Sequence, residues 1–173
     1  MAVKKLVSIA IAAIAGQLFA GTYTWTGAAG DGLYFTAGNW DYTDDGGATT
    51  SPAATSPGNT PADDIVIANG DTVSYDPGGD WKPSGTTTIS GGSTLVQSNG
   101  GAWAEIRGAL VLDGGTYDSG TAGQVRFDGT VTVRSGGALF LRGTASNSSL
   151  GSFVIETAER SSARAPGAAR SRS

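Results

Sequence analysis

Short runs in which apolar and polar residues alternate recur along most of the chain, and turn-forming residues separate them. No run repeats apolar residues at the spacing of an amphipathic helix over a useful length. Strict alternation is typical of half-buried β-strands. The pattern therefore predicts an all-β protein, with strands at residues 65–67, 72–75, 86–89, 93–97, 104–107, 109–112, 124–127, 130–133, 138–141 and 152–155.

Glycine pairs give these strands a period. Asn69-Gly70 is followed by Gly91-Gly92, Gly114-Gly115 and Gly136-Gly137, at intervals of 22, 23 and 22 residues. A fixed period of this size is typical of solenoids, in which each repeat buries its apolar face against its neighbours. The sequence thus predicts a short parallel β-helix of about four coils, with about 22 residues per coil. The alternative is a β-sandwich, whose strands need no equal spacing.

Stacking of the coils would place one apolar column in the interior. Consecutive coils hydrogen-bond at strand spacing, about 4.8 Å, so equivalent residues lie above one another. We expect the paired glycines to supply positive φ angles at the corners. The residues expected to point inward are Ile106, Leu110, Leu112, Val125, Phe127, Val131, Val133, Leu139 and Leu141.

Composition excludes several kinds of site. The 173 residues fit one domain and contain neither cysteine nor histidine. Disulfides, zinc sites built on Cys or His, Ser-His-Asp triads and Cys-His pairs are therefore excluded. The formal net charge is −4, and residues 21–156 alone hold 14 acidic and 5 basic side chains. An acidic body argues against nucleic acid as a partner.

Residues 1–20 have the pattern of a signal peptide. Lys4 and Lys5 precede an apolar stretch at 6–15, and a short segment ending in Ala20 follows. This order matches a basic region, a hydrophobic region and a cleavage region. The alternative is a buried core helix. The apolar stretch is shorter than the roughly 20 residues that span a bilayer. We therefore expect export, a secreted or cell-surface location and no transmembrane segment in the mature chain.

A family resemblance appears in residues 22–143. The motifs that carry it are Tyr-Thr-Trp-Thr-Gly at 23–27, the turn at 30–32, Ala-Gly-Asn-Trp-Asp at 37–41 and the segment 61–76. They resemble the opening of large secreted bacterial surface proteins of the autotransporter-passenger type. The resemblance implies a right-handed parallel β-helix that two tryptophans, here Trp25 and Trp40, begin.

The tryptophans have two interpretations. Bulky aromatic residues can cover the open end of a first coil, which favours an N-terminal cap formed by Trp25 and Trp40. Alternatively, Trp25, Trp40 and Trp81 could stack against sugar rings and form a polysaccharide-binding site. Residues 42–62 are rich in Thr, Ser, Pro, Asp and Gly and are predicted to be a surface loop. Residues 21–62 would then form a cap and loop, and 63–156 the coils.

Aspartates crowd the start of the predicted coils. Asp63, Asp64 and Asp71 are the candidate calcium ligands, because calcium takes six to eight oxygen ligands. No EF-hand loop or glycine-rich calcium repeat is present in the sequence. Aspartate also stabilises turns through hydrogen bonds to nearby backbone groups, which is the alternative interpretation.

Charged residues in the repeats raise the question of catalysis. Polysaccharide lyases and hydrolases built on β-helices use Asp, Lys and Arg along a groove. The spacing of the carboxylates marks no catalytic pair, so solvent-exposed side chains are the simpler interpretation. The residues concerned are Glu105, Asp113, Asp118, Asp128, Arg107, Arg126, Arg134 and Arg142.

The end of the chain changes character. Residues 157–173 contain no large apolar side chain, so a disordered basic tail is expected. An equally good interpretation is that the natural passenger is longer and that this chain is truncated after about residue 157. The last coil, near 152–155, would expose apolar groups and unpaired backbone, which favours self-association. Lysine at Val154 is expected to weaken such association, because its charge would be buried unpaired.

Together these observations predict a secreted or cell-surface structural or adhesive β-solenoid without catalysis. The competing hypotheses are a polysaccharide-binding module and a β-helix polysaccharide lyase or hydrolase. Cell-surface components or polysaccharides would be the partners, and calcium the only cofactor considered.

Overall fold

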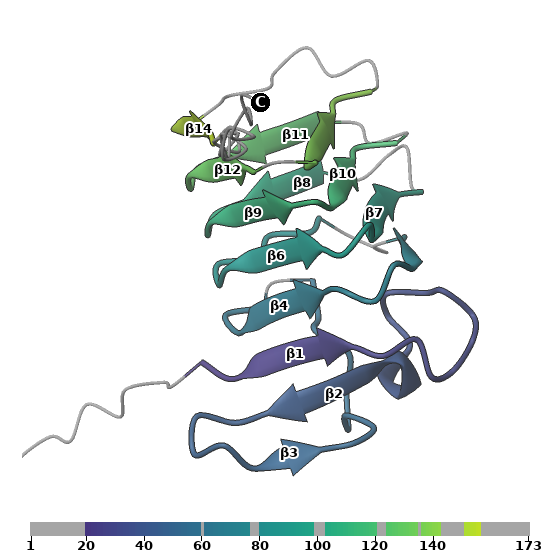
Figure 1. Cartoon of the computed structure of the whole chain (residues 1–173). Coiled ribbons are helices and arrows are strands. Elements are labelled where there is room, and N and C mark those ends of the chain that lie inside the picture. Colours follow the sequence, from purple (N-terminus) through teal and green to yellow (C-terminus); the bar gives the residue numbers. More distant parts are fainter. Residues whose placement is uncertain are drawn as a thin grey trace, which may run out of the picture.

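The protein is a β-solenoid. The computed structural model describes residues 20–59, 61–76, 80–98, 103–120, 124–134, 136–142 and 151–156. Most of the predicted signal peptide and the tail at 157–173 lie outside these residues. The described strands form three sheets that rise along one axis (Figure 1). Within the described part of the chain, no helix is long and apolar enough to cross a membrane.

The largest sheet shows the repeat directly. Its parallel strands are β4 (Asp64–Ile67), β6 (Thr87–Ser90), β9 (Leu110–Asp113), β12 (Val131–Val133) and β14 (Phe153–Ile155). The register aligns Ile65 with Thr87, Thr87 with Leu110, Leu110 with Val131, and Val131 with Phe153. These steps confirm the predicted period of about 22 residues. The β-sandwich alternative is wrong, because β9 and β12 pair in parallel.

Two further sheets complete each coil. One contains β5 (Thr72–Tyr75), β7 (Thr94–Gln97), β10 (Thr116–Asp118) and β13 (Ala138–Phe140). The other pairs β8 (Trp103–Ile106) with β11 (Gln124–Phe127), and a parallel bridge between Trp81 and Ala104 extends it one coil earlier. The described residues complete about three turns, and β12 and β13 belong to a further one. The coils wind in the right-handed sense (Figure 1).

The N-terminal end has a different topology. There β1 (Thr22–Trp25) pairs in parallel with β4 and antiparallel with β2 (Trp40–Thr43), and β2 pairs antiparallel with β3 (Thr49–Thr50). A short 3-10 turn, η1 (Ala37–Asn39), precedes β2. The surface loop predicted at 42–62 contains the end of β2 and the exposed two-residue strand β3. A two-residue edge strand offers little backbone for further pairing.

The core is a single column inside the three sheets. Of the residues predicted to point inward, Ile106, Leu110, Leu112, Val125, Phe127 and Val131 are buried. Val133 and Leu139 are partly buried against the core. The prediction for Leu141 is wrong, because 45% of this residue is exposed. Leu141 follows β13, which is the last strand of its sheet in the described residues.

Glycine supports the coils in two ways. Gly70, Gly91, Gly92, Gly114 and Gly136 have positive φ angles, as predicted for the corners, whereas Gly115 and Gly137 do not. A second column precedes the strands of the largest sheet and consists of Gly85, Gly108, Gly129 and Gly151. A Cβ atom on Gly108 would collide with the carbonyl oxygen of Gly85, and one on Gly129 with that of Gly108. Neighbouring coils therefore approach too closely at this column for any side chain.

Candidate functional site

The outer face of β8 and β11 presents an accessible aromatic ring beside charged side chains. Successive side chains of a strand point to opposite faces, so Ala104 and Ile106 enter the core. Trp103 and Glu105 consequently point outward from the same strand. Trp103 is 48% exposed, whereas the side chain of Glu105 is 16% exposed. We call this surface the Trp103 face.

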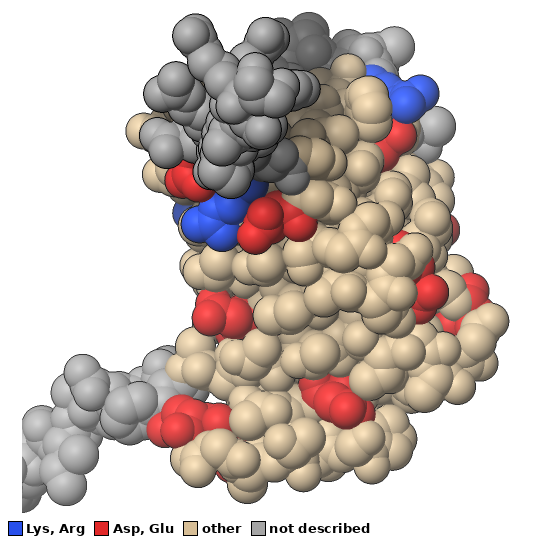
Figure 2. Space-filling model, in the orientation of Figure 1, with Lys and Arg blue, Asp and Glu red and all other residues tan. Residues whose placement is uncertain are grey.

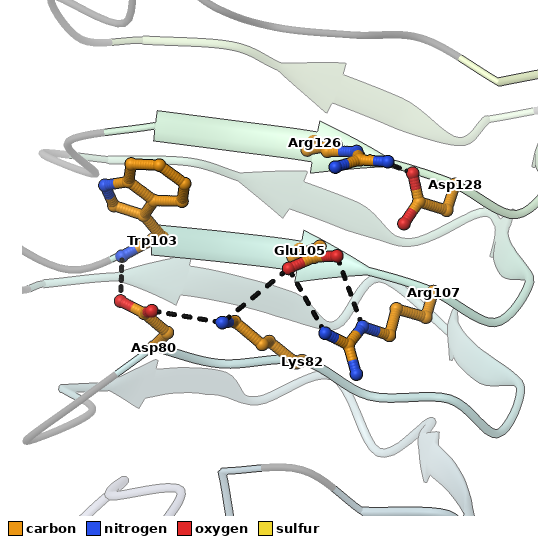
Figure 3. A network of polar contacts seen from close by, with 7 residues as sticks. All are labelled: Asp80, Lys82, Trp103, Glu105, Arg107, Arg126 and Asp128. Atoms are coloured by element: carbon orange, nitrogen blue, oxygen red, sulfur yellow. Dashed lines mark hydrogen bonds and ion pairs between the residues drawn. The ribbon is translucent and has the colours of Figure 1, made fainter.

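Parallel stacking determines which side chains neighbour Trp103 and Glu105. The bridge between Trp81 and Ala104 brings Asp80 and Lys82 beneath them, as Figure 3 shows. In the next coil, Gln124 is the register partner of Trp103, and Arg126 is that of Glu105. The Trp103 face thus has two outward rows. One row contains Asp80, Trp103 and Gln124, and the other contains Lys82, Glu105 and Arg126.

Ion pairs connect most of these charged groups (Figure 3). The Lys82 ammonium lies 3.2 Å from Asp80 Oδ2 and 3.7 Å from Glu105 Oε2. Arg107 Nε lies 3.2 Å from Glu105 Oε1. Arg126 Nε lies 2.7 Å from Asp128 Oδ1, and the backbone N–H of Trp103 donates to Asp80 Oδ1 over 3.4 Å. The Lys82–Glu105 contact therefore joins two successive coils, whereas Arg126 and Asp128 form a separate pair in the next coil.

Electrostatics fixes the ionisation of Glu105, which lies at the centre. A hydrogen bond from Arg107 holds the pKa of Glu105 below its usual value, and the charges of Arg107, Lys82 and Arg126 act in the same direction. Exposed pairs of this kind each contribute about 1 kcal/mol or less to stability. They place acidic and basic groups beside one another on this face.

The Trp103 face carries no net formal charge. Asp80, Glu105 and Asp128 are balanced by Lys82, Arg107 and Arg126. The chain as a whole is acidic, with a formal charge of −4. A charge-balanced face attracts neither polyanions nor polycations over long range.

The three tryptophans proposed from the sequence do not offer a stacking surface. Trp25 is 3% exposed, and Trp40 and Trp81 are fully buried. Trp25 donates from Nε1 to Asp71 Oδ2 over 3.0 Å, and Trp40 donates to the carbonyl oxygen of Tyr34 over 2.7 Å. The sugar-stacking interpretation of these rings is therefore corrected, because their faces are covered by protein.

Instead, the aromatic rings pack together in the N-terminal part of the core. The ring centroids of Trp25 and Trp40 are 5.0 Å apart, and those of Tyr34 and Trp40 are 5.1 Å apart, both edge to face. Tyr75 and Trp81 continue the cluster into the first coil, with centroids 4.8 Å apart. This arrangement has the geometry that the cap interpretation of Trp25 and Trp40 requires.

The three candidate calcium ligands are also engaged within the protein. Asp63 Oδ1 accepts from the backbone N–H of Gly21 over 2.8 Å. Asp64 Oδ1 accepts from the backbone N–H of Thr86 over 2.7 Å. Asp71 accepts from the Trp25 indole. No three acidic side chains in the described residues gather as a metal site would require. These carboxylates join the cap and neighbouring coils, and calcium binding by them stays a prediction.

The four carboxylates considered for catalysis lie on different faces. Glu105 and Asp128 belong to the β8–β11 side, Asp113 ends β9, and Asp118 ends β10. Each lies close to an arginine, including Arg134 at 3.5 Å from Asp113 and Arg142 at 3.0 Å from Asp118. The structure therefore does not bring all four carboxylates into one site.

Two hollows lie beside the N-terminal cap. The larger, of about 310 Å³, is lined by Thr26, Ala28, Ala29, Gly38, Asp41, Ser51 and Pro52. The smaller, of about 220 Å³, is lined by Trp25, Gly27, Gly30, Gly32, Asp71 and Thr72. Each has a single carboxylate in its lining, and Asp71 is already bonded to Trp25 and Asn69. They offer fewer converging polar groups than the Trp103 face.

The outer face of the largest sheet is mostly uncharged in the view of Figure 2. Its central outward row alternates threonine and valine: Thr24, Val66, Thr88, Val111, Thr132 and Val154. Charged side chains gather at its margin, where Arg134 lies 3.1 Å from Glu156. This face has no exposed aromatic ring in that row.

Sequence reasoning overlooked Trp103. The signal was present, because Ile106 was expected to point inward, and a period of two then places residues 103 and 105 outside. Comparison with known proteins found no family model, no curated protein and no solved structure that matches the chain. The site is therefore interpreted from its own geometry.

Proposed function

We propose that this protein is an exported structural and adhesive module, displayed at the cell surface and without catalytic activity. The observation that carries the proposal is the directional stack. An aromatic cap and an antiparallel hairpin cover the first coil, and each later coil adds strands in parallel register. Such a stack holds side chains at fixed intervals along one axis, as a short spacer or binding scaffold requires.

The sequence supports export. Residues 1–20 have the order of a signal peptide, and the motifs at 23–27 and 37–41 resemble those of secreted β-helix surface proteins. The proposal of a non-catalytic role rests on the carboxylates. Those considered as acid–base candidates are held in ion pairs with arginine and are distributed over different faces.

Export is tested by expressing the full chain with a C-terminal epitope in a bacterial host. We expect cleavage after Ala20, and an epitope that external protease removes from intact cells. An Ile11→Asp variant should stay uncleaved inside the cell, because a charge interrupts the hydrophobic region. Ser8→Ala is the matched control and should behave like the natural sequence. Retention of the natural chain in the cytoplasm, or equal export of Ile11→Asp, would contradict the proposal.

A further inference from the structure

We propose that the Trp103 face binds a neutral glycan, with the Trp103 ring stacked on a pyranose and the flanking polar side chains bonded to its hydroxyls. This proposal rests on the proposed function as a surface module, and it names the class of ligand that the module would bind. The binding chemistry itself depends only on the described residues of β8, β11 and the segment around Trp81.

Accessibility sets Trp103 apart from the other tryptophans. The chain has four, and Trp25, Trp40 and Trp81 are buried. Trp103 is 48% exposed on a strand whose inward residues anchor it to the core. An indole is a large flat apolar surface with little conformational freedom, which suits the apolar C–H face of a sugar ring.

Polar groups on both sides of Trp103 match sugar hydroxyls. Asp80 lies one coil below it and Gln124 one coil above, in the same outward row. The adjacent row supplies Glu105 and Arg126. An aromatic surface with a few fixed donors and acceptors is typical of sites for polar organic ligands. Because ion pairs already restrict several of these side chains, less conformational entropy is lost on binding.

Charge balance selects a neutral ligand. Three acidic and three basic groups lie on this face, so it has no net field for a polyanion such as a polyuronate. The acidic body of the chain would repel such a ligand further. Neutral hexose or pentose polymers meet no such repulsion and can use donors and acceptors alike. Their binding should therefore change little with salt concentration.

Fluorescence quenching by acrylamide provides the test, since Trp103 is the accessible tryptophan of the four. The purified full chain is titrated with mixed-linkage β-glucan, galactomannan, xylan and pullulan, and with polygalacturonate as the anionic comparator. We expect at least one neutral polymer to protect the quenchable fluorescence. Trp103→Ala should weaken binding roughly tenfold, whereas Trp103→Phe should stay within roughly threefold of the natural chain. Affinity electrophoresis in gels containing the same polymers gives the affinities of the two variants that lack the Trp103 fluorophore.

Leu33→Ala is the matched control, because Leu33 is also exposed, at 47%, but lies beside the cap. It should bind like the natural chain. The proposal is overturned if no neutral polymer binds, if polygalacturonate alone binds, or if Trp103→Ala binds as tightly as Leu33→Ala. If protection of the Trp103 fluorescence depends on protein concentration and not on polymer, a second copy of the chain covers Trp103. That result would also overturn the glycan proposal. Because purified protein is used, none of these outcomes depends on the export experiment.

Discussion

Inside the core, the Tyr75 hydroxyl donates a hydrogen bond of 2.7 Å to the side-chain oxygen of Gln97, one coil further on. The hydroxyl of Tyr117, in the coil after that, lies 3.0 Å from the Tyr75 hydroxyl. All three residues are buried. A polar contact across three coils favours one register, because a shifted coil would leave buried hydroxyls without partners.

The first prediction compares two buried tyrosines. Among the described residues the Tyr34 hydroxyl has no hydrogen-bond partner, whereas the Tyr75 hydroxyl bonds to Gln97. We expect Tyr75→Phe to lower the free energy of unfolding by about 1–3 kcal/mol, because its partners lose a bond in the core. Tyr34→Phe should change it by less than about 0.5 kcal/mol, since no bond is lost. Urea unfolding measures both values, and equal losses would show that the Tyr75 bond contributes nothing.

The second prediction concerns alkaline pH. Burial raises the pKa values of Tyr34, Tyr75 and Tyr117 well above the ordinary value of 10. The nearby Trp81 indole lowers the pKa of Tyr34 and so offsets part of the effect of burial. The two side chains nevertheless do not meet the geometry of a hydrogen bond. The unfolded chain releases these protons near pH 10 and the folded chain retains them.

Stability should therefore be complete below pH 10 and should fall as the pH rises above it. Urea midpoints measured from pH 8 to about pH 11 test this dependence. Tyr34→Phe should fall less steeply than the natural chain, because one proton fewer is released on unfolding. A constant midpoint across this range, or an unchanged slope in Tyr34→Phe, would be evidence against buried, protonated tyrosines.

The third prediction tests the glycine column. In Gly108→Ala the new methyl group would meet the backbone of Ser84 and Gly85 in the preceding coil. Backbone atoms cannot turn aside as a side chain can, so we expect a loss of at least about 2 kcal/mol in the free energy of unfolding. Gly58→Ala is the control, since its Cβ would have no neighbour within 4 Å. Thermal or urea unfolding of both variants measures these losses. A Gly108→Ala variant as stable as the natural chain would show that the coils can move apart at this column.

The fourth prediction concerns the C-terminal end face, formed by Phe140, Leu141, Phe153 and Ile155, which are 40% to 72% exposed. In the described residues β14 pairs with β12 alone, so an edge and an apolar surface lie together. We expect the chain to associate with a second copy through this face. Light scattering and sedimentation of residues 21–173 should then show a mass that increases with concentration.

The structure also corrects the substitution chosen from the sequence. Val154 aligns with Thr132 on the outer face, so a lysine there would reach solvent. Ile155 aligns with Val133 in the inward column. Ile155→Asp should therefore reduce association at least roughly tenfold, whereas Val154→Asp, with the same added charge, should have a much smaller effect. A natural chain that stays monomeric at high concentration would contradict the prediction.

The sequence by itself determined the all-β class, the period of about 22 residues and most of the core. These depend on local alternation and on glycine spacing, which a parallel stack repeats in every coil. It also placed positive φ angles at glycines such as Gly92 and Gly114. Local alternation with Ile106 inward places Trp103 outside. It does not decide whether Trp25, Trp40 and Trp81 are covered, because indoles are common in both settings.

The tertiary structure decided where each functional candidate points. The cap and the first coil close around Trp25, Trp40 and Trp81 and bury them. Trp103, in contrast, occupies an outward-facing position of β8. Asp71 accepts a hydrogen bond from the Trp25 indole, which lies 46 residues earlier in the chain, and no local motif encodes this pairing. The Trp103 face likewise joins Asp80, Glu105 and Arg126, which only the register of stacked coils brings together.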